Sequence, residues 1–291
     1  MSNTLDALSQ DIARIASKAH PSVVAIHGRR VAPSSGILWN GEGTVITAAH
    51  TLESDDSFEL TEAGGARKNA TLVGRDPGTN VAVLRVTDLD KPAPDWTDTS
   101  RLEAGHLAVV VAPHRAGLVA VNVVDEEWTT RSGGRLDRYI EIDPKRFRGF
   151  SGSLLLDCNG QALGMNTTGL ARRKPLTVPT ETLRRVVDNL IEHGEVRRGF
   201  LGITTSPVRL PSTVESQDVG LLILSVQPES PAAAAGLFLG DVVLGIESEI
   251  VQSPIALLTY LTEERIGKNV DMRILRAGEE KTVSVLLGKR K

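Results

Sequence analysis

A chain of 291 residues, 41% of them hydrophobic, can bury a sizeable core and is more typical of two domains than of one. Its formal net charge of −3 excludes the strongly basic balance of proteins that bind nucleic acid or anionic membranes, so we expect neither partner. The single cysteine, Cys158, excludes an internal disulfide and leaves no cysteine spacing for zinc, and we expect no metal and no cofactor.

Residues 1–20 predict a helical segment, because four apolar residues recur at intervals of three and four: Leu5, Leu8, Ile12 and Ile15. The segment has neither a basic start nor an apolar run of signal-peptide length, and no other segment is apolar enough to span a bilayer. If Met1 is the natural start, we expect a cytoplasmic protein. If the chain has been trimmed, a periplasmic or exported protein fits as well.

Residues 21–178 predict a β-rich domain. Short runs of Val, Ile and Leu are separated by Gly, Pro, Asn or Asp, which is typical of a sandwich or a barrel. The runs are SVVAIHG, GTVITA, TNVAVLRV, LAVVVA, LVAVNVV, LLLD and QALGMN. Asn159-Gly160, between the last two, predicts a hairpin in which both turn positions favour positive φ.

Residues 179–196 change to a helical period and predict a linker helix. Thr180 is the expected N-cap and Gly194 the expected C-terminal stop. The apolar face is formed by Leu183, Val186, Val187, Leu190 and Ile191. We therefore expect a domain boundary near Glu195.

Residues 197–291 combine short strands with two helical pieces and predict a compact α+β module, large enough to fold alone. The strand-like runs are FLGITT, GLLILSV, VVLGI, VDMRILR and TVSVLL, and the helical pieces are SPAAAAG and residues 253–266.

Two stretches in the β-rich domain contain residues suited to nucleophilic catalysis. His50 ends the run VITAAH, where an ordinary core or surface histidine is the alternative. Ser151 lies in the bend Arg148-Gly149-Phe150-Ser151-Gly152-Ser153, where a plain turn serine is the alternative. A nucleophilic serine needs such a bend, because the backbone N–H groups of Gly149 and Ser151 then converge on the developing oxyanion. The residues alone leave both interpretations open.

The stretches TAAH with His50, DPGTNVAVL with Asn80 and GFSGS with Ser151 resemble, in this order, the signature blocks of trypsin-like serine proteases of the HtrA (Deg) family. SPAAAAGLFLGDVVLGIES at residues 230–248, followed by RILRAGEEKTVSV, is similar to the PDZ module of that family. The resemblance covers nearly the whole chain from about Pro21.

This resemblance implies a mainly β fold, with a two-barrel chymotrypsin-fold protease domain at 21–178 and a PDZ domain at 197–291. It implies that Ser151 is the nucleophile, that His50 is the general base and then acid, and that the N–H groups of Gly149 and Ser151 form the oxyanion hole. The implied substrates are unfolded or misfolded polypeptides cut after small aliphatic residues. Residues 164–168, the implied lining of the specificity pocket, include no acidic residue that would attract Lys or Arg.

Asn80 occupies the position where the family has its catalytic aspartate. The alternative is a turn asparagine with the aspartate elsewhere, among Asp76, Asp88 and Asp90, although none of these directly precedes the apolar strand. A carboxylate only accepts hydrogen bonds, whereas an amide has a donating and an accepting end. With its NH₂ toward His50, the amide would select the wrong imidazole tautomer, and in either orientation it supplies no countercharge.

Two further departures from the family pattern concern the oxyanion hole. Phe150 replaces the usual Asn before the nucleophile, and Ser153 replaces a Gly, so that a β-carbon restricts φ and we expect a hole that is not preformed.

Two hypotheses follow. The chain is a slow serine endopeptidase, which we favour because His50 and Ser151 are both kept, or it is a pseudo-protease that acts as a peptide-binding, chaperone-like scaffold.

The resemblance to PDZ modules implies binding of polypeptide C-termini by addition of a strand to a sheet edge. The implied carboxylate-binding loop is Gly199-Phe200-Leu201-Gly202-Ile203, with residues 253–266 completing the pocket. Core strand positions for Leu201 and Ile203 are the alternative.

The family also assembles as trimers through N-terminal aromatic residues. The resemblance therefore implies a homo-oligomer, although the first aromatic residue here is Trp39.

Overall fold

The computed structural model describes residues 4–27, 33–52, 57–144, 147–171, 174–210 and 217–289. Its internal contacts divide the chain into two compact units, Met1–Val196 and Arg197–Lys291.

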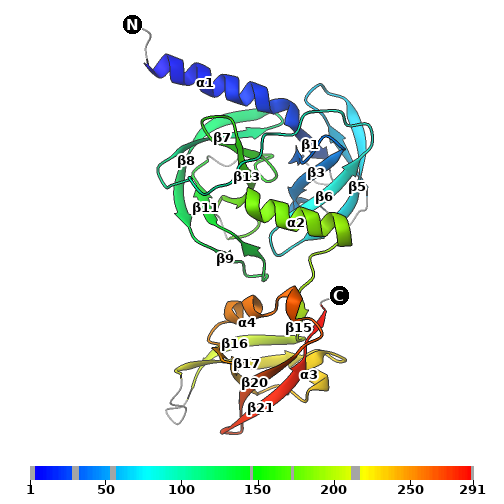
Figure 1. Ribbon diagram of the computed structural model, residues 1–291, viewed down its shortest axis with the longest axis vertical. Coiled ribbons are helices and arrows are strands. Elements are labelled where there is room, and N and C mark those ends of the chain that lie inside the picture. The colour runs from blue at the N-terminus through cyan, green and yellow to red at the C-terminus, as the bar shows by residue number, and fades with distance from the viewer. Residues whose placement is uncertain are drawn as a thin grey trace. The chain divides into compact units, whose positions relative to one another are not determined.

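The first unit begins with helix α1 (Thr4–Ala19) and a 3₁₀ turn (His20–Ser22). Only the C-terminal half of its apolar stripe packs on the barrels, through buried Ile15 and Ala19. Leu5 is 72% exposed and Leu8 38% exposed, and this end of α1 extends away from the barrels (Figure 1). The helix is therefore as predicted, but its stripe is only partly buried.

Two closed six-stranded barrels follow (Figure 1). The first has the strand order β1-β2-β3-β6-β5-β4 and consists of β1 (Val23–His27), β2 (Ser34–Leu38), β3 (Thr44–Ala48), β4 (Ser57–Thr61), β5 (Arg67–Asp76) and β6 (Val81–Val86). The second has the order β11-β14-β13-β12-β7-β8 and consists of β7 (Leu107–Ala112), β8 (Arg115–Asp125), β11 (Tyr139–Ile142), β12 (Leu154–Leu156), β13 (Ala162–Thr167) and β14 (Leu176–Pro179). A hairpin of β9 (Trp128–Thr129) and β10 (Arg135–Leu136) projects between β8 and β11.

The continuous apolar runs are explained by burial on both faces of the strands. In β6, Ala82 and Leu84 point into the interior of the first barrel, whereas Val81 and Val83 join a cluster shared with the second barrel. Because successive side chains alternate across a strand, a strand between two cores needs apolar residues at every position. In β7, Val109 and Val111 join that shared cluster.

Helix α2 (Thr180–His193) packs its apolar face on the same shared cluster and crosses β5 and β6 (Figure 1). Gly194 ends the helix in the left-handed region at φ 73°, as predicted. The predicted N-cap is wrong: the cap position is Pro179, and the Thr180 hydroxyl donates to the carbonyl of Ala162 at 3.2 Å. The hairpin prediction needs a similar correction, because only Gly160 of Asn159-Gly160 has positive φ.

The second unit is a sheet flanked by short helices. Its sheet has the order β16-β17-β18-β20-β21, with β19 paired to β18. The strands are β15 (Gly199–Phe200), β16 (Ile203–Arg209), β17 (Val219–Val226), β18 (Val242–Ile246), β19 (Glu249–Ile250), β20 (Asn269–Arg276), β21 (Glu279–Leu286) and β22 (Gly288–Lys289), and β15 pairs with β22. The helices are α3 (Pro231–Ala234) and α4 (Pro254–Tyr260), with a 3₁₀ turn at Glu263–Arg265. The helix expected over 253–266 therefore ends at Tyr260.

Candidate active site

The pairing of β3 with β6 brings His50 and Asn80 to the same end of the first barrel. Ala48 is the register partner of Val81, so the residues that follow β3 lie beside the residue that precedes β6. His50 lies in the 3₁₀ turn Ala49–Thr51, and the N–H of Ala49 donates to the carbonyl of Asn80 at 2.9 Å. Asn80 has φ 62°, in the left-handed region that asparagine adopts more readily than most residues.

The side chains of this pair are in contact. His50 Nδ1 lies 2.8 Å from Asn80 Oδ1, and the hydroxyl of Thr167 donates to the same oxygen, also at 2.8 Å. Asn80 is 4% exposed and Thr167 is fully buried, whereas His50 is exposed. The amide is thus held in a polar site inside the protein while the imidazole faces solvent.

Ser151 lies in the turn that precedes β12 of the second barrel, and the first barrel holds this turn. Ser35 of β2 donates its N–H to the carbonyl of Ser151 at 3.1 Å and its hydroxyl to the carbonyl of Gly149 at 2.5 Å. Gly152, at φ 87°, is a required glycine, because a β-carbon there would lie 1.8 Å from the Ser35 carbonyl oxygen. The bend that the sequence predicts is therefore fixed between the two barrels.

The segment 167–169, at the end of β13, contacts all three predicted catalytic residues. Thr167 bonds Asn80, and Thr168 donates its N–H to Ser151 Oγ at 3.2 Å, with its own hydroxyl also 3.2 Å from Ser151 Oγ. A β-carbon on Gly169 would lie 2.5 Å from His50 Nδ1. Among the hydrogen bonds between described residues, none joins His50 directly to Ser151. Such bonds are often long before substrate binds.

Two backbone donors near Ser151 are unoccupied. The N–H groups of Gly149 and Ser151 have no hydrogen-bond acceptor within the described part of the chain. Gly149 has φ 81°, which a glycine adopts without strain. These are the two groups that the sequence assigns to an oxyanion hole.

The turn before Asn80 is stabilised by hydrogen bonds to the carboxylate of Asp76 and by contacts with the β9–β10 hairpin. Asp76, which is 2% exposed, accepts from the N–H groups of Gly78 and Thr79 at 3.0 Å and from the Thr79 hydroxyl at 2.7 Å. The buried hydroxyl of Thr130 donates to the carbonyl of Gly78 at 2.8 Å. A β-carbon on Gly134 would lie 2.1 Å from the carbonyl carbon of Gly78, so the hairpin and the turn pack backbone against backbone. Asp76 thus caps its own turn, and Asn80 is the residue that reaches His50.

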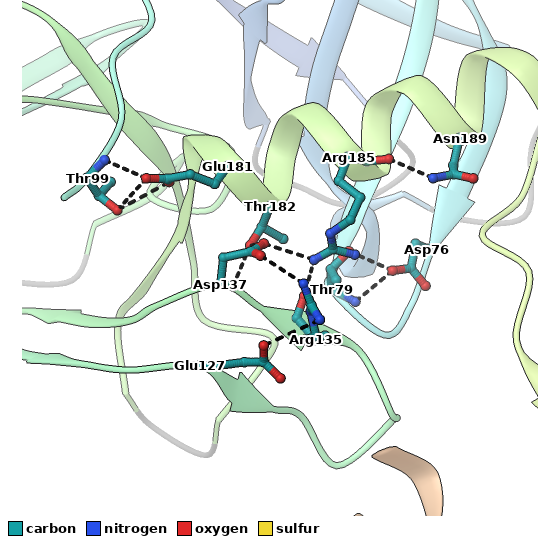
Figure 2. A network of polar contacts seen from close by, with 10 residues as sticks. All are labelled: Asp76, Thr79, Thr99, Glu127, Arg135, Asp137, Glu181, Thr182, Arg185 and Asn189. Atoms are coloured by element: carbon teal, nitrogen blue, oxygen red, sulfur yellow. Dashed lines mark hydrogen bonds and ion pairs between the residues drawn. The ribbon is translucent and has the colours of Figure 1, made fainter. Parts of the chain in front are cut away.

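Helix α2 is tied to the same hairpin by ionic contacts (Figure 2). Asp137 accepts from the Thr182 hydroxyl at 2.7 Å and pairs with Arg185 at 3.0 Å. Arg135 bridges Asp137 and Glu127 at 3.3 and 3.4 Å. Burial alone raises the pKa of Asp137, but the hydrogen bonds from Thr182 and Arg185 outweigh it and hold that pKa below its ordinary value.

A cavity of about 390 Å³ lies beside the chain that continues from Gly169. Its apolar lining includes Leu170, which is buried, and Ala171, which is half-buried. The other lining residues are Asp125, Glu126, Glu127, Trp128, Arg131, Tyr139 and Lys174. Within the described ranges, no group of three or more His, Cys, Asp or Glu side chains is arranged to hold a metal ion.

In the second unit, the predicted loop 199–203 leads into β16, the edge strand of the sheet, and α4 contacts β16. The N–H groups of Leu201 and Gly202 have no acceptor in the part of the chain that the structure describes. Gly202 has φ 83°, and a β-carbon there would lie 2.2 Å from the β-carbon of Ser230. Leu201 is 2% exposed and belongs to the core of this unit, whereas Phe200 and Ile203 are half-buried.

Sequence reasoning missed two residues of the first site. It treated residues 164–168 only as a pocket lining and did not foresee that Thr167 bonds Asn80 or that Gly169 lies against His50. No local signal indicates these contacts, because their partners are far away in the sequence.

Known proteins share the fold of both units. Residues 34–165 match the trypsin-like peptidase domain model, and residues 199–287 match the PDZ domain model. The solved structure described as the HtrA-type protease AlgW with decapeptide superimposes with a TM-score of 0.76 at 23% identity, covering 96% of this chain and 99% of that one. The serine endoprotease from Yersinia pestis superimposes with a TM-score of 0.74 at 23% identity, covering 96% and 98%. The class is therefore a trypsin-like double barrel followed by a PDZ domain.

Curated relatives share both parts. A probable periplasmic serine endoprotease, DegP-like, of Bartonella henselae is 29% identical over 273 residues, which are 89% of this chain and 54% of the relative. The corresponding protein of Halomonas elongata is 30% identical over 266 residues, 87% of this chain and 56% of the relative. The chain carries a trypsin-like peptidase domain followed by a PDZ domain; it is similar in fold to HtrA-type proteases and in sequence to DegP-like serine endoproteases. It spans about half the length of the curated relatives that it matches. None of the described helices combines the length and the apolar character that a membrane crossing requires.

Proposed function

We propose that the chain is a serine endopeptidase that cleaves unfolded or misfolded polypeptides, with Ser151 as nucleophile, His50 as base and Asn80 as the group that orients His50. The observation that supports this most is the contact of His50 Nδ1 with Asn80 Oδ1 at 2.8 Å. The names of the relatives, which are serine endoproteases, support the same reaction.

The orientation of the Asn80 amide decides the tautomer of His50. The Thr167 hydroxyl already accepts the N–H of Gly169 at 3.0 Å, so its own hydrogen is free to be donated to Asn80. The amide oxygen then faces both Thr167 and His50. An oxygen acceptor requires the hydrogen on His50 Nδ1, which leaves Nε2 unprotonated. In this tautomer His50 is able to accept a proton from Ser151.

The reaction follows from these roles. Ser151 Oγ attacks the scissile carbonyl while its proton moves to His50 Nε2, and His50 then returns that proton to the leaving amine. The N–H groups of Gly149 and Ser151 bond the oxyanion, and water completes the cycle by the same steps. Because the Asn80 amide is neutral, the imidazolium lacks its countercharge and the reaction is slow. In a well-studied triad, replacement of Asp by Asn lowers kcat by about 10⁴-fold.

The cavity beside Leu170 supports a polypeptide substrate. It is lined by Leu170, two residues beyond Thr168, which contacts Ser151, so an extended chain bound along residues 167–169 would pass close to it.

A pseudo-protease that only binds peptides is the second candidate. It is favoured by the position of Ser151 Oγ, which contacts Thr168 and is without a hydrogen bond to His50 among the described residues. Such a scaffold would keep the cleft without turnover.

Cleavage of unfolded casein by the purified chain separates the two candidates. An endopeptidase degrades casein, loses this activity in Ser151→Ala and gains activity in Asn80→Asp. Equal, near-zero rates in the original chain and in Ser151→Ala, together with unchanged casein binding, would favour the scaffold. If Asn80→Asp fails to raise the rate of an active chain, Asn80 is not the orienting group.

We also propose that the PDZ domain at 197–291 binds polypeptide C-termini on β16. The free N–H groups of Leu201 and Gly202 support capture of a carboxylate, and the open edge of β16 supports strand addition. Gly202→Ala, which would press against Ser230, should abolish binding of C-terminal peptides. A peptide with an amidated C-terminus is the ligand control, and equal binding of the two peptides would contradict the proposal.

We propose an exported location, because the relatives are named as periplasmic proteins. Fractionation of the native cells tests this, and recovery of the protein with the cytoplasmic fraction would contradict it. Assembly into a homo-oligomer stays a prediction, which the mass of the purified protein in solution would test.

A further inference from the structure

The carbonyl of Phe150, directly before the nucleophile, is held by two donors from one residue. Ser153 donates its N–H to this carbonyl at 3.1 Å and its hydroxyl at 2.6 Å. Ser153 stands where the family pattern has a glycine, and its φ is not positive, so the β-carbon causes no backbone strain.

The hydroxyl of Ser153 is itself oriented by a buried chain of hydrogen bonds. Thr177 donates its hydroxyl to Asn166 Oδ1 at 2.8 Å, and Asn166 Nδ2 donates to Ser153 Oγ at 3.0 Å. These three residues are fully buried, at 0% exposure, so water does not compete for their polar groups. Because Thr177 occupies the amide oxygen, the amide NH₂ faces Ser153, and the hydroxyl hydrogen of Ser153 is left to point at the Phe150 carbonyl.

The orientation of this carbonyl fixes the next N–H group. In a trans peptide unit the C=O and the N–H point in opposite directions, and the described residues include no cis peptide bond. The Phe150 carbonyl points toward Ser153 and the second barrel, so the N–H of Ser151 points away from it. That N–H has no acceptor among the described residues.

The ring of Phe150 restrains the same peptide unit from the other side. It is 3% exposed, lies in the core of the second barrel and meets Phe147 edge to face, with ring centroids 5.8 Å apart. The Phe150–Ser151 peptide is therefore restrained in two ways: Ser153 bonds its carbonyl, and the core holds the ring of Phe150.

We propose that Ser153 is a positioning residue for the oxyanion hole: its hydroxyl, set by Asn166 and Thr177, holds the Phe150–Ser151 peptide so that the Ser151 N–H faces the developing oxyanion. This rests on the proposed serine endopeptidase reaction. The sequence predicts that Ser153, in place of a glycine, leaves the oxyanion hole not preformed. The proposal is the opposite: the serine side chain adds a hydrogen bond that orders the turn.

The test uses the full chain and compares Ser153→Ala with the original on a peptide ester. Loss of one oxyanion donor lowers kcat by about 10²–10³-fold, so misalignment of this donor should lower kcat by roughly tenfold, with KM changed less than twofold. A peptide boronic acid, whose tetrahedral adduct occupies the hole, should lose affinity by the same factor. The corresponding peptide amide, which forms no adduct, should bind as before.

Two further comparisons separate positioning from general stability. Ser22→Ala is the matched control, because it removes the hydroxyl of a serine that is 3% exposed and that also donates to a carbonyl, that of Pro92 at 2.7 Å, and it should leave kcat unchanged. Thr177→Val removes the hydrogen bond from Thr177 to Asn166 and should also lower kcat. Thr177→Ser retains the hydroxyl and should leave kcat unchanged. If Ser153→Ala does not fold, the comparison of Thr177→Val with Thr177→Ser tests the proposal instead.

Unchanged kcat and boronic acid affinity in Ser153→Ala, or equal losses in Ser22→Ala, would overturn the proposal. If the original chain itself cleaves nothing, the proposed function fails, and a crystal structure of Ser153→Ala still decides the positioning. A turned Phe150–Ser151 peptide supports the role of the hydroxyl, and an unchanged peptide overturns it.

Discussion

Thr167 Oγ1 lies 2.8 Å from Asn80 Oδ1, and the two residues are 87 positions apart in the sequence. This hydroxyl fixes which end of the Asn80 amide faces His50, a choice that an aspartate would not need because its two oxygens are equivalent acceptors.

We therefore predict that Thr167→Val lowers kcat by about tenfold in the original chain, because the amide is then free to turn its NH₂ toward His50. In the Asn80→Asp background the same change should have less than a twofold effect. A double-mutant cycle on a peptide ester measures this difference. Thr167→Ser keeps the hydroxyl and is the control. Equal losses in both backgrounds would mean that Thr167 acts only through packing.

Gly169→Ala should reduce activity by at least tenfold, since its β-carbon would lie 2.5 Å from His50 Nδ1 and 2.7 Å from Asn80 Nδ2, closer than van der Waals contact permits. The backbone of Gly169 does not have positive φ, so the change acts through this contact. Gly41→Ala is a matched control, because nothing lies within 4 Å of its added β-carbon. Initial rates on casein, with a melting curve for each variant, make the comparison. Full activity in Gly169→Ala would exclude the His50–Asn80 pair from catalysis.

Thr130→Val should destabilise the first unit by about 1–3 kcal/mol, because it leaves two buried backbone groups without a partner. These are the carbonyl of Gly78, 2.8 Å from the hydroxyl, and the N–H of Gly134, 2.9 Å from it. Thr130→Ser keeps both bonds and should lose less than half as much. Urea unfolding followed by tryptophan fluorescence reports on this unit, since all three tryptophans, Trp39, Trp96 and Trp128, lie within it. An unchanged midpoint in Thr130→Val would contradict the role of this hydroxyl.

The PDZ domain should lose stability in acid through Asp241. Its side chain is 3% exposed and pairs with Arg276 at 2.7 Å. Burial alone raises the pKa of Asp241, but the hydrogen bonds from Arg276 and from the N–H of Phe238 outweigh it, so the pKa lies below the ordinary 3.8. Because the folded-state pKa is lowered, the pair stabilises the fold fully above pH 3.8 and loses this contribution as the pH falls through the folded-state value.

Asp241→Asn tests this contribution by calorimetry of the full chain. At neutral pH it should destabilise the PDZ transition by about 3 kcal/mol, as expected when one partner of a buried pair is removed. The difference from the original chain should shrink as the pH falls below the ordinary carboxyl pKa. A difference that stays constant down to acidic pH would show that the charge of Asp241 does not contribute. Lys281→Gln, which changes an exposed cation near Asp241, should have little effect because exposed charges are screened.

The sequence by itself determined the two-part organisation and most of the strands, and the roles of the candidate catalytic residues stay predictions. The run from Val81 to Leu84 predicts a strand because it is short, rich in β-branched residues and preceded by turn-forming residues, and α2 is predicted because its apolar period matches a helix. His50, Asn80 and Ser151 were found through a resemblance, since nothing local distinguishes a catalytic side chain from a turn residue.

The tertiary structure alone decided which polar groups meet. Thr180 looked like an N-cap, yet its hydroxyl bonds the carbonyl of Ala162 in another strand. Ser153 looked like a loss of freedom at a glycine position, yet it completes a buried chain with Asn166 and Thr177. Apolar burial depends on a periodic pattern that neighbouring residues display, whereas a hydrogen bond depends on the distance and direction between two atoms. Strand register and barrel closure bring most of those atoms together from different strands, so no single short stretch of sequence shows the whole network.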